Sequence, residues 1–393
     1  MSGTLAYSIE FQMTLLLFIG LAGYLLAARI NQSAVVGEIL VGLIVGPSVL
    51  GLITYTDFVQ TLAGLGAVIL LFVIGFEFKL KDLIDVRYGV IGLIGIIVPW
   101  IGGYYLSLLF GFDFESAIFV GTALTATSIA ITANVLREID VLHTDVAKAI
   151  ISTAVIDDVL SLIALAITAD VVSGTFSIFN IFQILTKEVA FIVIAGAIGV
   201  RVLAPMLKKM DKTKIAKKYP EFVFITAMAI AFFYATCAEF IGSSGIIGAF
   251  IAGVALGSVD LVHSKSIHES TESLYIIFAS IFFISLGILV DIHTITQESL
   301  IFLVALTVVA IITKVVGCGL PAKLFGMSWR DSLILGFGMS PRGEVAMIVA
   351  LLGLSQNLIT KDIFAVVVMM SLLTTVITPI VYRGWFYRDT APA

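Results

Sequence analysis

The sequence consists largely of apolar blocks of about 20 residues separated by short polar connections. A helix of about 20 apolar residues crosses the hydrocarbon core of a bilayer, which is about 30 Å thick. A membrane β-barrel would alternate polar and apolar residues, and these blocks do not. Charged residues make up 12% of the chain, against about 25% in soluble domains. The blocks therefore predict an all-α membrane protein that crosses the bilayer many times.

Thirteen blocks are long enough to count as predicted spans, with the ninth the shortest and rich in glycine. They cover residues 8–29, 34–52, 58–77, 88–110, 114–136, 146–170, 179–205, 220–241, 245–258, 271–290, 299–324, 330–355 and 362–383. The N-terminus lacks the basic region and cleavage site of a signal peptide, so the first block is expected to remain as a span.

Basic residues are distributed unevenly between the connections. Of the 22 Lys and Arg residues, 18 follow odd-numbered spans or lie in the C-terminal tail, and only Lys187 and Lys361 follow even-numbered spans. Cytoplasmic loops carry the excess of Lys and Arg in membrane proteins. The sequence therefore predicts a multi-pass protein of the cell membrane (the inner or plasma membrane), with its N-terminus outside and its C-terminus in the cytoplasm.

The chain contains an internal repeat. The glycines of GEILVGLIVG (37–46) recur at identical spacing in GAFIAGVALG (248–257), and LLFGFDFESAIFVG (108–121) resembles KLFGMSWRDSLILG (323–336). Both matches pair spans that are seven apart. Seven is odd, so the second copy is expected to be inverted relative to the first. Inverted repeats are typical of secondary transporters, whose substrate site lies near the bilayer midplane.

Two spans at matching places in the repeat carry helix-breaking sequences. Span 5 contains Thr125, Thr127 and Ser128, and span 12 contains the run SPRGE, 340–344. Proline removes a backbone donor and keeps the preceding residue out of helical angles. Hydroxyl side chains satisfy freed backbone groups in lipid. The pattern predicts two broken helices that cross near the midplane, where a transporter binds its substrate.

Five ionisable residues lie deep inside the predicted spans: Asp157, Asp158, Lys314, Arg342 and Glu344. Each costs about 2.5–3.5 kcal/mol at the centre of a membrane helix. These residues must therefore pair with one another, exchange protons, or line water. In the repeat Asp157-Asp158 aligns with Thr374-Thr375, so the scaffold is symmetric while the charges are not.

The adjacent aspartates are the candidate ion-binding centre. Neighbouring helix positions point about 100° apart, so Asp157 and Asp158 cannot both face one partner. One can face a cation such as Lys314, and the other an aqueous cavity. Two like charges this close favour protonation of at least one of them. Such a carboxylate suits a site where protons and alkali cations compete.

Structural interpretations of the same residues remain open. The two aspartates could belong to a purely structural buried network, and Lys314 could be a counter-ion with no part in transport. Arg342 and Glu344 could compensate the partial charges at the ends of the broken helices. The hydroxyl groups from Thr125 to Ser128 could donate hydrogen bonds to carbonyls of their own helix.

The remaining composition predicts no cofactor. Cys237 and Cys318 fall inside apolar blocks and indicate small buried residues, not a disulfide or a metal site. The four histidines fall in polar connections and form no ligand cluster. No soluble-enzyme motif is visible, and nucleic acid is not an expected partner. The expected surroundings are membrane lipid, and the expected substrates are ions.

At these residues the sequence resembles the monovalent cation:proton antiporter-2 family over nearly its full length, and most of all the NapA-type bacterial sodium/proton antiporters. The motifs that carry the resemblance are GEILVGLIVGP (37–47), FVIGFEFKLKDL (72–83), GTALTATSIAITANVL (121–136), AVIDDVLSL (154–162), Lys314 and SPRGEVAMIVA (340–350). The glutathione-gated potassium efflux relatives carry a further C-terminal nucleotide-binding domain, and the end of this chain at Ala393 leads us to expect no nucleotide gating.

The resemblance implies a homodimer with an elevator-type mechanism. The moving core would comprise residues 88–170 and 299–383, and the dimerisation scaffold residues 8–77 and 179–290. Asp158 would carry the ion, either Na⁺ (or Li⁺) or a proton. Asp157 would pair with Lys314, and Thr127, Ser128 and neighbouring atoms of the crossing would complete the cation site.

The resulting hypothesis is an electrogenic Na⁺/H⁺ antiporter with alternating access. A K⁺/H⁺ antiporter of the same family is the nearest alternative. A cation channel and a sodium-coupled symporter for an organic solute are more distant ones. The motifs do not distinguish Na⁺, Li⁺ and K⁺, and they do not give the stoichiometry or the pH profile.

Overall fold

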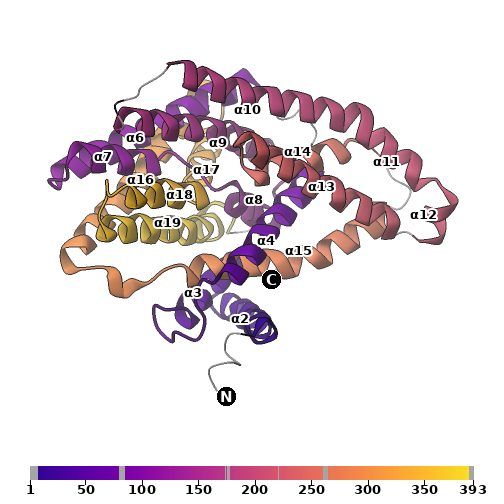
Figure 1. Ribbon diagram of the computed structural model, residues 1–393, viewed down its shortest axis with the longest axis horizontal. Helices are drawn as coiled ribbons and strands as arrows, with labels where there is room; N and C mark the ends of the chain where they lie inside the picture. The colour runs from indigo at the N-terminus through magenta and orange to yellow at the C-terminus, as the bar shows by residue number, and fades with distance from the viewer. Residues whose placement is uncertain are drawn as a thin grey trace. The chain divides into compact units, whose positions relative to one another are not determined.

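A computed structural model describes residues 8–78, 85–172, 174, 178–219, 221–259 and 264–388, and every regular element in these ranges is helical (Figure 1). The end of the FVIGFEFKLKDL motif, with Lys79 and Lys81, lies outside the described residues. The chain divides into two compact units. The first comprises residues 1–55, 85–181 and 284–393, and the second residues 56–84 and 182–283.

The first unit contains both interrupted helices and most of the buried charges. Its elements are α2 (Ile9–Arg29), α3 (Ala34–Val45), α6 (Val86–Leu109), α7 (Phe114–Ala123), α8 (Ile129–Glu138), α9 (Asp145–Val172), η2 (Ile292–Thr294), α16 (Gln297–Leu324), α17 (Trp329–Gly338), α18 (Glu344–Ser355), α19 (Lys361–Val381) and η3 (Tyr382–Phe386). Side chains fix several starts: Asp113, Thr296 and Thr360 accept hydrogen bonds from the first turns of α7, α16 and α19.

The second unit is built around α4, α13 and α14. Its elements are α4 (Asp57–Phe76), most of α10 (Ile178–Ile198), η1 (Gly199–Leu203), α11 (Ala204–Asp211), α12 (Lys214–Lys218), α13 (Glu221–Ile241), α14 (Gly245–Leu256) and most of α15 (Ser264–Ile288). Its core includes Phe72, Ala231 and Ala252, all fully buried.

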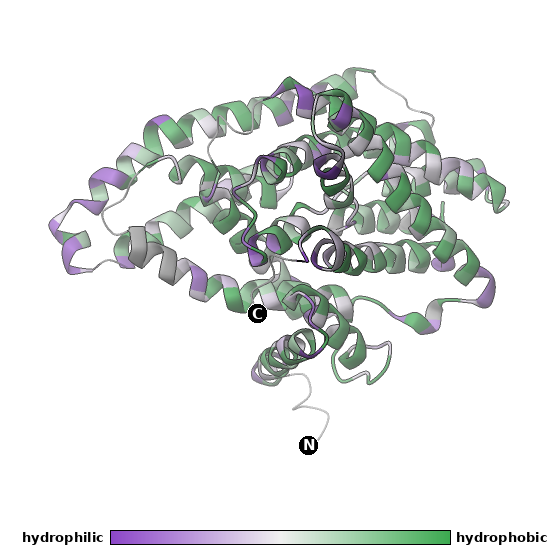
Figure 2. Cartoon of the chain, turned by 180° about the vertical axis from the view of Figure 1, so that it is seen from behind, coloured by the Kyte–Doolittle hydropathy of each residue, from purple (hydrophilic) through white to green (hydrophobic). Residues whose placement is uncertain are grey.

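The described residues include nine helices long and apolar enough to cross a membrane, and four shorter apolar ones. Hydrophobic residues dominate the helices, while hydrophilic residues gather in the connections (Figure 2). Each of the thirteen predicted spans contains a helix or a broken pair of helices. The number of actual crossings and the orientation of the termini stay predictions.

Three predicted boundaries differ from the structure by six residues or more. Span 10 was expected to begin at 271, but α15 begins at Ser264. Span 2 was expected to reach residue 52, but α3 ends at Val45 because Pro47 keeps Gly46 in an extended conformation (φ −70°, ψ −171°). Span 7 was expected to end at 205, but the helix continues through the π-helical turn η1 into α11 and ends at Asp211.

The repeated glycines lie where helices touch backbone to backbone. A Cβ at Gly42 of α3 would collide with the carbonyl oxygen of Ile284, inside the first unit. At the matching place in the repeat, a Cβ at Gly253 of α14 would collide with the carbonyl oxygen of Phe72, inside the second unit. Small residues permit this close approach of membrane helices. The shared spacing of the two motifs therefore reflects the same packing requirement.

Candidate functional site

The two interrupted helices are bonded to each other at their breaks. The first interrupted helix leaves helical geometry between α7 and α8. The second does so between Gly338 of α17 and Glu344 of α18. Both breaks lie where the sequence predicts them. The backbone N–H of Ser128 donates to the Pro341 carbonyl at 2.8 Å. The Thr127 hydroxyl donates to the Met339 carbonyl at 3.1 Å. These bonds satisfy polar backbone groups that neither helix can satisfy alone.

Two further contacts lie at the crossing, which the non-helical segments 124–128 and 339–343 form together. The Thr132 hydroxyl of α8 donates to the Gly338 carbonyl at 2.6 Å, which covers an acceptor at the end of α17. A Cβ at Gly343 would lie 2.7 Å from the Cβ of Ser128. The glycine of the SPRGE run is therefore needed because the other broken helix passes directly against it.

Arg342 lies inside the crossing with no exposed surface. Its Nη1 donates to the Ala126 carbonyl at 2.7 Å and lies 3.4 Å from the Thr125 carbonyl. Its Nη2 donates to the Ala310 carbonyl of α16 at 3.1 Å. The guanidinium therefore supplies positive charge to carbonyls that the break in α7–α8 leaves without helical donors.

The backbone of Arg342 is held from α19. The Thr374 hydroxyl accepts from the Arg342 N–H at 3.1 Å, and the Thr375 hydroxyl donates to the Arg342 carbonyl at 3.0 Å. These threonines align with Asp157 and Asp158 in the repeat. One copy therefore has carboxylates at these two positions, and the other has hydroxyls that fix the broken chain.

Asp157 of α9 and Lys314 of α16 form a fully buried ion pair. The Nζ–Oδ1 distance is 2.7 Å, and both side chains have no exposed surface. Thr127 of the first break lies beside the same carboxylate. At this burial each charge is costly without the other, so the pair is a unit whose members cannot be removed separately at low cost.

Gly95 of α6 makes room for this pair. A Cβ at Gly95 would collide with Cys318 Sγ and would lie 3.9 Å from Lys314 Nζ. Nearby, a Cβ at Gly317 of α16 would lie 3.1 Å from the Ile94 carbonyl. Glycines on both helices thus let α6 and α16 approach closely where Lys314 turns toward α9.

Asp158 follows Asp157 on α9 and is 8% exposed. Consecutive helix positions point about 100° apart, so the Asp158 carboxylate leaves the helix in a different direction from the ion pair. Asp158 therefore places a second carboxylate directly after Asp157, whose charge is balanced by Lys314.

The other predicted site residues have distinct places. The Thr125 hydroxyl bonds back to the Thr122 carbonyl at 2.7 Å, so Thr125 offers Arg342 its main-chain oxygen. Ser128 caps no helix end with its side chain and packs against Gly343. Glu344 begins α18, and its side chain is outside the described residues. In the described part of the chain, no three His, Cys, Asp or Glu side chains cluster as metal ligands.

Sequence reasoning did not identify several residues that shape the site. Gly95, Thr132 and the Ala310 carbonyl carried no signal, because their roles depend on which helices are neighbours. Thr374 and Thr375 did carry one, since they align with the aspartates in the repeat. Cys237, expected to be buried, is partly exposed, whereas Cys318 is buried; both thiols are free.

A helical fold with many apolar spans and two interrupted helices crossing beside buried charges defines a multi-pass membrane transporter. The profile of the transmembrane sodium/hydrogen exchanger family matches residues 14–386. The chain therefore belongs to this family of monovalent cation:proton antiporters, as the motifs led us to expect.

Individual relatives agree with this assignment. The chain is 34% identical over 357 residues to the Na⁺/H⁺-K⁺ antiporter GerN of Bacillus cereus, covering 90% of each protein. It is 30% identical to the Na⁺/H⁺ antiporter of Enterococcus hirae, covering 91% of this chain and 93% of the relative. The structure of the sodium proton antiporter MjNhaP1 from Methanocaldococcus jannaschii superposes over the full length of both chains with a TM-score of 0.71 at 17% identity, so the fold is shared.

Proposed function

We propose that this protein is a Na⁺/H⁺ antiporter in which Na⁺ and protons compete for Asp158, while Asp157 pairs with Lys314 when no cation is bound. The observation that carries the proposal is the fully buried 2.7 Å pair of Asp157 with Lys314, one residue from Asp158 and beside the crossing. Buried carboxylates in a membrane span are functional sites by default, because their burial costs free energy.

The proposed cycle uses the difference between the two aspartates. Na⁺ enters at Asp158, with Thr127, Ser128 and Asp157 contributing oxygen atoms, and Lys314 leaves Asp157 and releases its proton. On the other side protons displace Na⁺ and the ion pair forms again. Arg342 keeps a fixed positive charge at the Thr125 and Ala126 carbonyls, so the break persists whether or not a cation is present. Glu344 is proposed to balance charge at the start of α18.

Proton flux in proteoliposomes with a pH gradient tests the site. Adding Na⁺ or Li⁺ should collapse the gradient with the wild type and not with Asp158→Asn, because the amide cannot exchange a proton. Glu188→Gln is the matched control, since Glu188 is a carboxylate in α10, 2% exposed, in the second unit. Exchange at the wild-type rate in Asp158→Asn would sink the mechanism. Flux with no coupling to protons would indicate a channel, and a requirement for an organic solute would indicate a symporter.

We further propose that the protein is a homodimer whose core, residues 88–170 and 299–383, moves against a scaffold formed by residues 8–77 and 179–290. The family assignment supports this proposal. Pulsed electron-spin distances test it, with spin labels at Lys148 and Lys217 in a background without Cys237 and Cys318. The distance should change between Na⁺-loaded and Na⁺-free protein. A label pair at Lys208 and Lys217, both in the scaffold, is the control and should not change.

K⁺/H⁺ exchange is the second candidate, because GerN is named as a Na⁺/H⁺-K⁺ antiporter. The same flux assay distinguishes the two. A response to K⁺ in the absence of Na⁺ and Li⁺ would place this chain with potassium-transporting relatives, and Asp158→Asn should abolish that response as well.

A further inference from the structure

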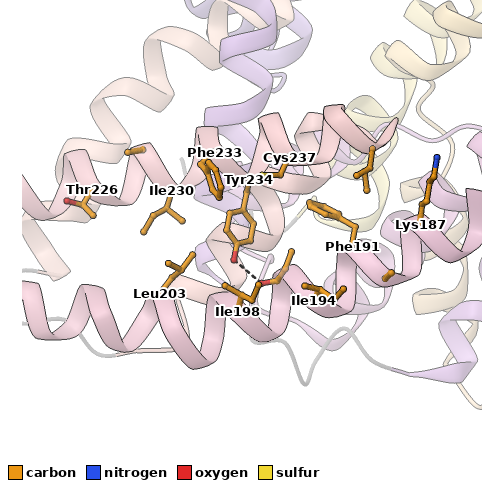
Figure 3. A pocket seen from close by; sticks show the side chains of 14 residues that line it. Lys187, Phe191, Ile194, Ile198, Leu203, Thr226, Ile230, Phe233, Tyr234 and Cys237 are labelled. Atoms are coloured by element: carbon orange, nitrogen blue, oxygen red, sulfur yellow. Dashed lines mark hydrogen bonds between the residues drawn. The ribbon is translucent and has the colours of Figure 1, made fainter.

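The second unit contains an apolar groove of about 730 Å³ between α10 and α13. Figure 3 shows the 14 side chains that line it, with Lys187 at one end and Leu203 and Thr226 toward the other. The proposed transport cycle does not use this groove, which is lined only by residues of the second unit.

The two hydroxyl groups on the groove walls already have hydrogen-bond partners. The Tyr234 hydroxyl donates to the Ala195 carbonyl at 2.9 Å, a bond drawn in Figure 3. The Thr226 hydroxyl donates to the Phe222 carbonyl at 2.8 Å. An ordered water needs two to four polar partners, and an apolar cavity without them takes up apolar ligands instead. The walls therefore favour a hydrocarbon occupant.

The charge pattern of α10 to α11 predicts that Lys187 lies near the lipid headgroups, and it moves the start of span 7 from the first predicted boundary at 179 to residue 189. The stretch 189–207 has 19 residues, with Arg201 its only charged one, and is flanked by Lys187-Glu188 and Lys208-Lys209. About 20 residues cross the hydrocarbon core, so the two flanking pairs mark its two boundaries. Lys187 is exposed, whereas its neighbour Glu188 is 2% exposed and turned into the unit. The groove thus ends at an accessible cation near the membrane surface.

The dimensions fit one hydrocarbon chain better than a protein segment. From Lys187 to Leu203 the helix rises by about 24 Å, at about 1.5 Å per residue. Distributed over that length, the groove volume of about 730 Å³ gives a cross-section of about 30 Å². A helix with side chains is about 10–12 Å wide and covers about 80–110 Å². The groove can therefore enclose one acyl chain along its length, whereas a helix of a second copy could insert only its side chains.

We propose that this groove binds an anionic glycerophospholipid, with one acyl chain between α10 and α13 and the phosphate against the Lys187 ammonium. Apolar burial in the groove provides the attraction for any lipid chain, and Lys187 selects the anionic headgroup. The site is independent of the ion pair in the first unit.

Native mass spectrometry of the purified protein with phosphatidylglycerol or phosphatidylcholine tests the site. The wild type should retain phosphatidylglycerol about fivefold more than phosphatidylcholine, the factor expected for one basic residue at an anionic headgroup. Lys187→Gln should remove that preference, and Lys187→Arg should keep it. Lys361→Gln is the matched control, because Lys361 is the other basic residue that follows an even-numbered predicted span. Its preference should equal that of the wild type.

Filling the groove provides a second variant. Ala229→Phe places a ring among the lining residues and should lower retention of both lipids, whereas Lys187→Gln affects only the anionic one. Unfolding temperatures show whether each variant is folded. If Ala229→Phe does not fold, the lipid preference of Lys187→Gln alone tests the proposal. Wild-type preference in Lys187→Gln would overturn the proposal. So would a folded Ala229→Phe variant with unchanged lipid retention, or one that changes only the ratio of monomer to dimer.

Discussion

Arg342 is a buried cation whose terminal nitrogens reach main-chain oxygens on two different elements. A lysine keeps the charge but has a single ammonium, which cannot reach both the Ala126 and the Ala310 carbonyl. Each lost bond to a charged donor costs about 1.5–3 kcal/mol. We therefore expect Arg342→Lys to lower the unfolding temperature and to slow cation-driven proton flux about tenfold or more.

Arg201→Lys is the control for this substitution, because Arg201 is exposed. It should change neither the unfolding temperature nor the flux. If Arg342→Lys left the unfolding temperature and the flux unchanged, as the control should, the hydrogen bonds from the guanidinium to the Ala126 and Ala310 carbonyls would not be what stabilises the crossing.

Glu138 gives the stability a pH dependence outside the spans. Its Oε1 and Oε2 accept from the Ala34 N–H at 3.0 and 3.2 Å, and Oε1 lies 3.7 Å from Arg383 Nη1. Burial nevertheless raises the pKa of Glu138 above its ordinary value of 4.5, because desolvation outweighs these donors. A raised carboxyl pKa adds stability below the unfolded pKa that is lost as pH rises through the folded pKa.

Glu138→Gln should therefore gain in unfolding temperature relative to the wild type as the pH rises from about 4.5 toward neutrality. Scanning fluorimetry across that range measures the difference. Glu10→Gln, at an exposed carboxylate in the first turn of α2, should show a smaller change. A constant difference between Glu138→Gln and the wild type at all pH values would contradict the prediction.

At the scale of elements, the contact between α6 and α16 depends on Gly95. Gly95→Ala forces a methyl group against Cys318 Sγ and should cost about 1–3 kcal/mol, the usual range for overpacking. Gly89→Ala in the same helix meets nothing within 4 Å and should be neutral or stabilising. Thermal unfolding of both variants measures the contrast, and Cys318→Ala should restore most of the loss in Gly95→Ala. Equal unfolding temperatures for Gly95→Ala and Gly89→Ala would show that the helices can separate freely.

The sequence predicted the elements of the site better than their contacts. Pro341 and the hydroxyls near Thr127 indicated where two helices break, because proline and backbone geometry are local properties. The partner of Arg342 was not predictable from local sequence, since its acceptors are main-chain atoms that every residue type carries. The end of α3 was missed for a related reason: residues 46–52 are apolar enough for a span, and Pro47 should have been weighed above hydropathy.

At the scale of the molecule, the proposed cycle moves one net charge if two protons exchange for one Na⁺. A membrane potential of 100 mV would then contribute about 2.3 kcal/mol per turnover. Lys314→Gln removes the proton carrier, so we expect exchange that no longer responds to voltage. Flux in proteoliposomes clamped by K⁺ and valinomycin at several potentials measures this. The double variant Lys314→Gln with Asp157→Asn is the control, because it avoids an unpaired buried carboxylate.

Voltage-dependent exchange by Lys314→Gln would instead leave Lys314 as a structural counter-ion.

The family resemblance predicted that Lys314 pairs with Asp157, and in the structure Lys314 Nζ lies 2.7 Å from Asp157 Oδ1. Composition alone predicted only that such a charge needs a partner. The division of the chain into two units was not predictable in detail, since residues 1–55 join the unit that contains the crossing.

The way Arg342 holds the crossing also bears on how the family can vary. The Thr125 and Ala126 groups that meet Arg342 belong to the main chain, and substitutions at those two codons leave a carbonyl in place. The guanidinium, by contrast, is encoded at a single position. Genetic variation at Thr125 and Ala126 therefore leaves the acceptor atoms of this contact in place, whereas any substitution of Arg342 removes its donors.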